Sequence, residues 1–462
     1  MLPVSTMNKI LWDNIQAFDF DEPASEYGFS TRLANENYWT RDFTRQAILE
    51  YKKFMYLAAT SDLMVSPSEI VDTVWHQHLI FTQLYQDFCE LIGKQVQHVP
   101  STHNKEDFQK FKQAKERTTK LYEEVFGEQP ATIWHYNDMY ESLHLKKAKT
   151  KLRTFVIIGI ITITLLTVPF YYLLLPVYRN IDTPDFFFIF LAITIGIYLF
   201  LEIHNTTSLK RIVKKFDRDS FIYHLQPSEV IFLKTQKNAE VVNNTANEMI
   251  NHHIINIHSD NRLELDESRP LKGDEQRQFA TVLKEQGKSA YPILLTQLVL
   301  KPVFSNTASC MNAFKKYFYK SQLFGRLFQL NFWLLALVLL LLTTRITTGI
   351  IREKPVIALI VPVIALTIIM IFYLKRLTSL VCTTTIPAIY KNEVLPSRIN
   401  ENETPWRYFL LGKAALAASF IPIITYLDRH QHSGDSGSGC GSSCGSSCGS
   451  SCSSCGGCGG GD

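Results

Sequence analysis

The chain has 462 residues, 46% of them hydrophobic, with 47 lysines and arginines against 43 acidic residues and a formal net charge of +4. This balance is too even for a chain that binds nucleic acid along its whole length. Uncharged apolar runs in the second half are too long for a purely soluble protein. We therefore expect a mainly α-helical protein: a soluble helical N-terminal domain and a polytopic membrane region, with a small α+β winged-helix-like insert.

Residues 1–145 have the charge and aromatic content of a soluble helical domain. Apolar residues recur at helical spacing over 43–59, which predicts a helix there. The segment Ser66-Pro67-Ser68-Glu69 combines a capping residue, a proline of the first turn and an acid near the positive helix end. It predicts a second helix that runs toward Phe88. Residues 107–126 predict a third, amphipathic helix.

A histidine cluster in this domain is the candidate functional site. Asp72 and His76 are four residues apart and share one helix face, so the aspartate can orient the imidazole or both can bind one metal ion. The candidate set also includes His78, and it draws on His98 and His103 from the following loop. Such ligands suit zinc or another transition metal, for example iron(II). The alternative is a histidine that Asp72 merely satisfies at a helix junction.

Several stretches within residues 27–135 carry further motifs. They are Phe29-Ser30-Thr31-Arg32-Leu33-Ala34, Glu50-Tyr51-Lys52-Lys53-Phe54, Ser66-Pro67-Ser68, Val71-Asp72-Thr73-Val74-Trp75-His76-Gln77-His78, His98-Val99-Pro100 and Phe126-Gly127-Glu128-Gln129-Pro130-Ala131-Thr132-Ile133-Trp134. Together they resemble the glycine-rich domain-containing protein family, whose hallmark is a Val-Asp-x-x-Trp-His-x-His core followed by a loop with paired histidines. Here the loop reads Gln97-His98-Val99-Pro100, so one of the paired histidines is missing. A four-ligand metal site carried over from the family therefore lacks a ligand, and the resemblance implies no defined activity.

Four apolar runs are long enough to be membrane-spanning helices, since about 20 helical residues cross a bilayer core of about 30 Å. They form two predicted hairpins, one in 146–204 with spans 155–178 and 186–203, and one in 326–376 with spans 327–344 and 355–374. Residues 377–428 are a connector with a fifth predicted span over 409–427, where Lys413 can snorkel to the interface. The alternative for this fifth segment is a helix that lies in the interface.

Lysines and arginines gather on one side of these runs, and such residues are retained in the cytoplasm. They are Lys146, Lys147, Lys149, Lys151, Arg153, Lys210, Arg211, Lys214, Lys215, Arg218, Lys315, Lys316, Lys320, Lys375 and Arg376. We therefore expect a cytoplasmic N-terminus and the lipid bilayer as a partner. The connection 345–354 is the exception, with three positive charges on the outer side. Five spans put the C-terminal tail outside the cell, and four keep it inside.

Residues 205–325 form a second soluble unit between the hairpins. Two short helices are predicted over 227–233 and 239–252, then a strand hairpin over 254–266 and a longer helix from Asp274. This order is typical of a winged-helix module. The hairpin carries three acids against Arg262 alone, so a protein partner is expected and nucleic acid is disfavoured. The histidines at 252, 253 and 258 are a second candidate metal cluster, unless they only end a helix.

Two motifs lie next to the predicted spans. They are Gln226-Pro227-Ser228-Glu229-Val230, after the second apolar run, and Arg345-Ile346-Thr347-Thr348-Gly349-Ile350-Ile351-Arg352-Glu353-Lys354-Pro355-Val356, between the third and the fourth. Through them most of residues 200–380 resemble uncharacterised bacterial membrane proteins that end in glycine- and cysteine-rich tracts. The resemblance implies a multi-pass protein of the bacterial inner membrane.

Residues 429–462 are rich in Gly, Ser and Cys and cannot bury a core, so we expect a disordered tail. Its six cysteines recur at regular spacing; they are Cys440, Cys444, Cys448, Cys452, Cys455 and Cys458. Six thiolates can bind zinc or Cu(I), oxidise to disulfides outside the cell, or carry no ligand. Cys89, Cys310 and Cys382 are scattered and are expected to be unpaired packing residues.

These features favour a metal-linked binding or scaffold component of the bacterial envelope, and a non-enzymatic role over an enzymatic one. The apolar runs lack the charged residues that mark ion or proton paths, which argues against a transporter. The alternative is a metal-dependent enzyme, with Asp72, His76 and His98 as ligands and His78 as the acid–base group.

Overall fold

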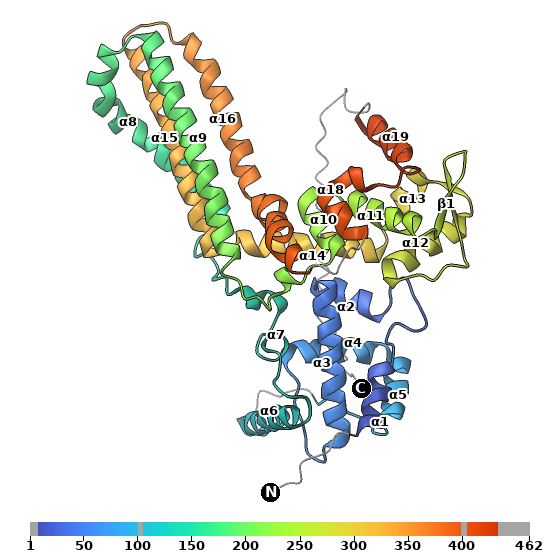
Figure 1. Ribbon diagram of the computed structural model, residues 1–462. Helices are drawn as coiled ribbons and strands as arrows, with labels where there is room; N and C mark the ends of the chain where they lie inside the picture. Colours follow the sequence, from blue (N-terminus) through green and yellow to red (C-terminus); the bar gives the residue numbers. More distant parts are fainter. Residues whose placement is uncertain (1–7, 100–104, 399–403, 433–462) are drawn as a thin grey trace, which may run out of the picture.

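The computed structural model describes residues 8–99, 105–398 and 404–432 of the chain, and these are mainly α-helical. Figure 1 shows three regions: N-terminal helices in blue, a bundle of long helices that projects away from them, and a group of shorter helices with one small sheet. The helices at the chain start and the bundle therefore lie at opposite ends of the molecule.

The N-terminal region is built around one long helix. Its helices are α1 (Lys9–Ala17), α2 (Phe29–Asn37), α3 (Arg41–Thr60), α4 (Glu69–Ile80), α5 (Thr82–Leu91), α6 (Lys105–Phe126) and α7 (Ala131–Trp134). Helix α3 buries Ala47, Tyr51, Phe54 and Met55 and contacts α1, α2, α4 and α6. The helices predicted over 43–59 and 107–126 are confirmed as α3 and α6.

The helix predicted to run from the Ser68 cap toward Phe88 begins correctly but ends early. The Ser68 hydroxyl accepts a hydrogen bond from the backbone N–H of Val71 at 3.2 Å, as a capping residue should. The chain leaves helical geometry at Phe81, and α5 starts at the next residue. The ring of Phe81 packs edge-on against Phe29, with centroids 5.6 Å apart, so a tertiary contact divides the predicted helix in two.

Four helices of the described chain are long and apolar enough to cross a membrane, and we call them the apolar bundle. They are α8 (Leu152–Asn180), α9 (Thr183–Val213), α15 (Gln322–Ile351) and α16 (Ile357–Leu377). Helix α15 contacts the other three, and 39% of its most apolar stretch is buried, against 6–11% in the others. The four predicted spans coincide with these helices, and α9 continues well past its predicted end.

The fifth predicted span, 409–427, is wrong. Helix α18 (Thr404–Leu411) ends at a 3₁₀ turn (Gly412–Ala415), and α19 (Ile421–His432) starts only after a break. Gly412 has a φ of +59°, a left-handed conformation that interrupts the helix. Phe420 is fully buried and meets Tyr291 edge-on at 4.9 Å, so this apolar segment packs on the middle of the chain instead of forming one long helix.

The connection between α15 and α16 is shorter than predicted. Arg345 lies inside α15, and its guanidinium donates to the carbonyl oxygens of Tyr178 at 2.6 Å and Ile181 at 2.9 Å. These carbonyls belong to the C-terminal end of α8, where a cation stabilises the helix dipole. One of the three positive charges that opposed the predicted orientation is therefore held by the bundle itself.

The middle of the chain contains the sheet. Its elements are α10 (Pro227–Thr235), α11 (Asn238–Asn251), β1 (Ile255–Ile257), β2 (Arg262–Leu265), α12 (Gly273–Gln286), β3 (Ser289–Ala290), α13 (Tyr291–Leu298) and α14 (Pro302–Tyr319). The antiparallel order is β1-β2-β3, with Ile255 opposite Leu265 and Leu263 opposite Ser289. The predicted succession of two helices, a hairpin and a helix is observed, and β3 is an addition. The short helix α17 (Ile386–Ile389) lies between α16 and α18.

A buried carboxylate joins the N-terminal region to α10. Glu229 accepts hydrogen bonds from the backbone N–H of Arg41 at 3.0 Å and from that of Gln226 at 2.7 Å, so it caps α3 and α10 together. The Arg41 guanidinium lies 2.5 Å from a carboxylate oxygen of Glu275. Burial raises the pKa of Glu229 to about 7, although the two N–H donors oppose this shift.

Candidate metal site and adjoining pocket

Helix α4 has two faces with different environments. Ile70, Val71 and Val74 are fully buried in the core. Asp72 and His76, one turn apart, lie on the other side, where 31% and 56% of their side chains are exposed. The four-residue spacing therefore places Asp72 and His76 on one accessible helix face, as the sequence predicts.

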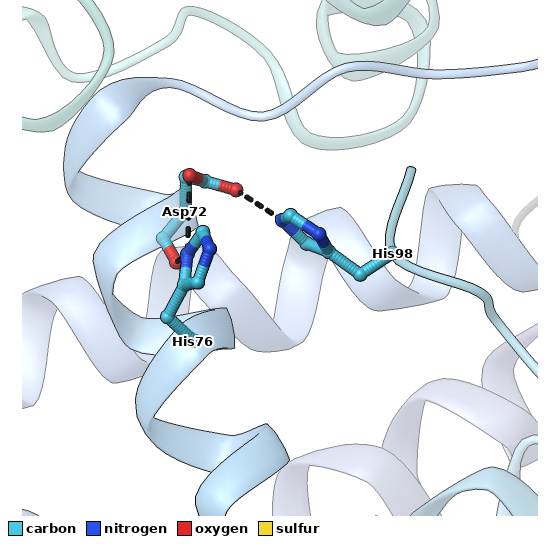
Figure 2. Close-up of side chains that lie close together, drawn as sticks. All are labelled: Asp72, His76 and His98. Atoms are coloured by element: carbon cyan, nitrogen blue, oxygen red, sulfur yellow. Dashed lines mark hydrogen bonds and ion pairs between the residues drawn. The ribbon is translucent and has the colours of Figure 1, made fainter. Parts of the chain in front are cut away.

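The structure brings His98 to this face (Figure 2). One carboxylate oxygen of Asp72 lies 3.0 Å from His98 Nε2, and the other lies 3.2 Å from His76 Nδ1. The centroids of the His76 and His98 rings are 4.4 Å apart. Each of the three residues offers one ligand atom, and these three atoms lie within 4.8 Å of one another. We call Asp72, His76 and His98 the metal cluster.

The loop that carries His98 is held by aromatic side chains. Trp75 meets the His98 ring edge-on, with centroids 4.7 Å apart. The Trp75 indole N–H donates to the Tyr85 hydroxyl at 3.2 Å, and that hydroxyl donates to the Val96 carbonyl oxygen. Only 16% of the His98 side chain is exposed, so its position is fixed by packing. Trp75 is buried in the core, and it also orients a member of the cluster.

His78 does not join the cluster. Its ring is completely buried, and its Nδ1 lies 2.8 Å from the Tyr51 hydroxyl. The rings of Phe20 and Phe88 surround it, with centroids 4.7 and 5.5 Å away. Burial lowers the pKa of His78 to about 4. It is a neutral core residue, which also removes the surface acid–base role considered for it.

The other predicted ligands do not add to this site. His103 and the six tail cysteines lie outside the described residues. His258 instead pairs with Glu264 at 2.5 Å, and among the described residues the metal cluster is the one group with metal-ligand spacing. Cys89, Cys310 and Cys382 are buried and unpaired, as predicted.

A pocket of about 690 Å³ adjoins the cluster, and Asp72 and His98 form part of its wall. Its apolar wall includes Phe54, Trp75 and Phe111 from three different helices. No sequence motif indicated this pocket, because its lining comes from α3, α4, α6 and two loops. The volume is in the range of pockets that hold small organic molecules.

The donor set fits a divalent transition metal. Two imidazoles and a carboxylate are common zinc ligands, and tetrahedral bonds of about 2.1 Å place ligand atoms about 3.4 Å apart. The carboxylate already lies 3.0 and 3.2 Å from the two ring nitrogens, so small side-chain rotations would complete the arrangement. His76 Nδ1 is also 2.9 Å from the Asp72 carbonyl oxygen. In a second arrangement the other ring nitrogens bind the metal, while Asp72 only orients the imidazoles.

Comparison with known proteins gives one partial match. The model of a family described as UCP032817-like matches residues 19–123, and that family is uncharacterised. The matched residues contain the whole metal cluster and every residue that lines the pocket, but none of the apolar bundle. The match confirms neither the glycine-rich domain-containing family nor the bacterial membrane proteins that the sequence resembles. No curated protein and no solved structure matches the chain.

Proposed function

We propose that this chain is a membrane-anchored metal-binding protein, in which Asp72, His76 and His98 bind a divalent transition metal, with zinc as the first candidate. The observation that carries the proposal is the convergence of His98, from a separate loop, on two groups already aligned by helix spacing. A histidine that merely satisfied Asp72 would need no second imidazole at 3.0 Å. Two imidazoles and one carboxylate are common zinc ligands, which supports the proposal.

The proposed setting is the bacterial inner membrane, with the N-terminus in the cytoplasm. Lysines and arginines next to the four spans favour this orientation. Four spans return the chain to the side on which it started, so the cysteine-rich tail would also be cytoplasmic. In that reducing compartment thiolates and bound metal are favoured over disulfides. We infer a binding or scaffold role with a protein partner for the soluble regions.

The test is zinc binding by the purified full-length protein in detergent. The six tail cysteines are replaced by serine, so that thiolates do not contribute to the signal. We expect one zinc per chain by titration calorimetry and metal analysis, and a large loss of affinity in His98→Ala. His135→Ala is the matched control, because His135 is an exposed histidine of the same region outside the cluster. Absence of stoichiometric zinc, or equal loss in both variants, contradicts the proposal.

A metal-dependent enzyme is the second candidate, and one observation favours it. Three protein ligands leave a coordination position for water or substrate, which is typical of catalytic zinc sites, and a pocket lies beside the cluster. A zinc-loaded protein that hydrolyses a panel of ester and amide substrates, with the activity lost in His98→Ala, would favour the enzyme over the binding role.

A further inference from the structure

The pocket beside the metal cluster has walls of two kinds. Phe54, Leu63, Val65 and Phe111 give it an apolar side. The rest of the lining includes uncharged polar residues and six charged groups, three lysines against three carboxylates, one of which is Asp72. A divalent ion on the cluster would therefore make the charge of the lining net positive.

The three lysines differ in how they are used. Lys94 donates to the carbonyl oxygens of Ala58 and Ser61, each at 2.8 Å, and so binds the C-terminal end of α3. Lys112 and Lys115 are exposed and lie three residues apart on α6, so both reach the pocket from one helix face. They supply positive charge at the rim.

We propose that this pocket binds a small organic acid, with its apolar body against the aromatic wall and its carboxylate between the cluster metal and the α6 lysines. The inference rests on the proposed metal site and deepens it by naming the ligand class. A carboxylate is a good ligand for the open position of a three-ligand zinc site. A volume of about 690 Å³ accommodates a body much larger than acetate.

Apolar and charged walls act on different parts of such a ligand. Burying the body releases water from the solvent-accessible apolar side chains of the wall, Leu63 and Phe111, which adds affinity in proportion to apolar area. The carboxylate gains from the metal and from Lys112 and Lys115, which an amide of the same shape cannot use. The site would thus discriminate by charge at one end and by length at the other.

The probe is 4-(4-fluorophenyl)butyrate, followed by ¹⁹F NMR on the full-length protein in lipid nanodiscs, with empty nanodiscs as the blank. Zinc content is measured first on the same sample. We expect saturable binding that is at least tenfold tighter in the zinc-loaded than in the zinc-free protein. The corresponding amide and fluoroacetate should bind at least tenfold more weakly than the probe.

Two double variants test the role of the lysines. Lys112→Glu with Lys115→Glu should weaken probe binding at least tenfold and leave zinc content unchanged. Lys110→Glu with Lys120→Glu is the control, since it makes the same charge change at exposed positions of α6 outside the pocket. Zinc binding without saturable probe binding, equal affinity with and without zinc, or equal losses in both double variants overturns this inference alone. A protein that binds no zinc overturns the proposed function, and the inference with it.

Discussion

Two polar clusters of this molecule differ in whether their side chains are buried and paired with each other or lie on an accessible face. At the base of the apolar bundle, Asn205 and Asn331 exchange amide hydrogen bonds of 2.8 and 2.7 Å and are fully buried. Tyr373 accepts a further bond from Asn205 at 3.1 Å. At the metal cluster, two imidazoles share one carboxylate on an accessible face.

The difference shows how a structural polar contact is told from a candidate site. The asparagine amides of α9 and α15 pair with each other inside the bundle, where an unpaired amide would be costly. In the metal cluster each imidazole uses one nitrogen on Asp72, and its second nitrogen bonds to no other residue in the described part of the chain. Asp72 and His98 also line a pocket. Substitutions in the bundle should therefore change stability, and substitutions in the cluster should change metal affinity.

The largest expected effect is the loss of metal affinity in His76→Ala and in His98→Ala. Each removes one of three ligands, so zinc affinity should fall at least a hundredfold, about 3 kcal/mol, with the melting temperature of the metal-free protein nearly unchanged in His76→Ala. Titration calorimetry together with thermal unfolding measures both quantities. A large drop in metal-free stability and unchanged affinity would reverse the contrast between the two regions.

Glu229 is a third polar site, and it belongs with the structural kind. Its folded pKa of about 7 lies above the ordinary value of 4.5, so the native state holds this proton more tightly than the unfolded state. The stability gained from that protonation is complete below pH 4.5 and is lost as the pH rises through about 7. Between pH 5 and 8 the wild type should lose on the order of 2 kcal/mol through this group.

The variant Glu229→Gln resembles the protonated carboxyl and should remove that part of the pH dependence. Thermal unfolding of the full-length protein in detergent at pH 5, 6, 7 and 8 measures it, with zinc affinity at constant pH as the control. Parallel curves for wild type and variant would show that Glu229 does not titrate in this range.

Asp72→Asn should have an intermediate effect. The amide keeps the shape of the side chain and loses the charge that both imidazoles contact. The amide oxygen still contacts the metal or the rings, so zinc affinity should fall about tenfold, less than on removal of an imidazole and within the range for groups that orient metal ligands. Titration calorimetry measures this zinc affinity. Asp72→Glu should not retain the wild-type affinity, because the longer side chain misplaces the carboxylate.

Asn331→Ala should destabilise the bundle by about 1 kcal/mol, the usual size of a hydrogen bond between helices in a membrane. A double-mutant cycle with Asn205→Ala isolates the pair, and the second substitution should cost little once the first is made. Zinc affinity should not change in any of these variants. Additive losses would mean that the two asparagines do not act together.

The smallest effect is expected from Arg376→Gln. Its guanidinium pairs with Glu202 at 2.6 and 3.1 Å, but about half of each side chain is exposed, so the pair should contribute less than about 1 kcal/mol. Unfolding at low and high salt checks this, since a screened pair should lose its effect in salt.

Periodicity and run length predict much of this fold because they are local properties. Helix α3, helix α6 and the four helices of the bundle follow from apolar spacing or length alone. The segment 409–427 has the composition of a span, yet the left-handed Gly412 and the burial of Phe420 against Tyr291 decide its course. Both depend on contacts that composition does not encode.

The candidate site also has a part that local spacing predicts and a part that depends on tertiary contacts. The spacing of Asp72 and His76 on one helix is local, so the sequence predicts their alignment. His98 reaches them because Tyr85 and Trp75 hold its loop, which is a tertiary property. A residue two positions on lies about 200° around a helix, which explains why His78 is buried in the core while His76 lies on the exposed face of α4. The Asn205–Asn331 pair had no local signal, since its members are 126 residues apart.

X-ray absorption at the zinc edge, on the purified full-length protein with the six tail cysteines replaced by serine, is the most direct test of the proposed metal site. A metal on Asp72, His76 and His98 gives a first shell of nitrogen and oxygen at about 2.0–2.1 Å, with the outer scattering of two imidazoles. His98→Ala should reduce that imidazole signal. A first shell without imidazole scattering, unchanged imidazole scattering in His98→Ala, or no stoichiometric zinc would contradict a metal site on these three residues.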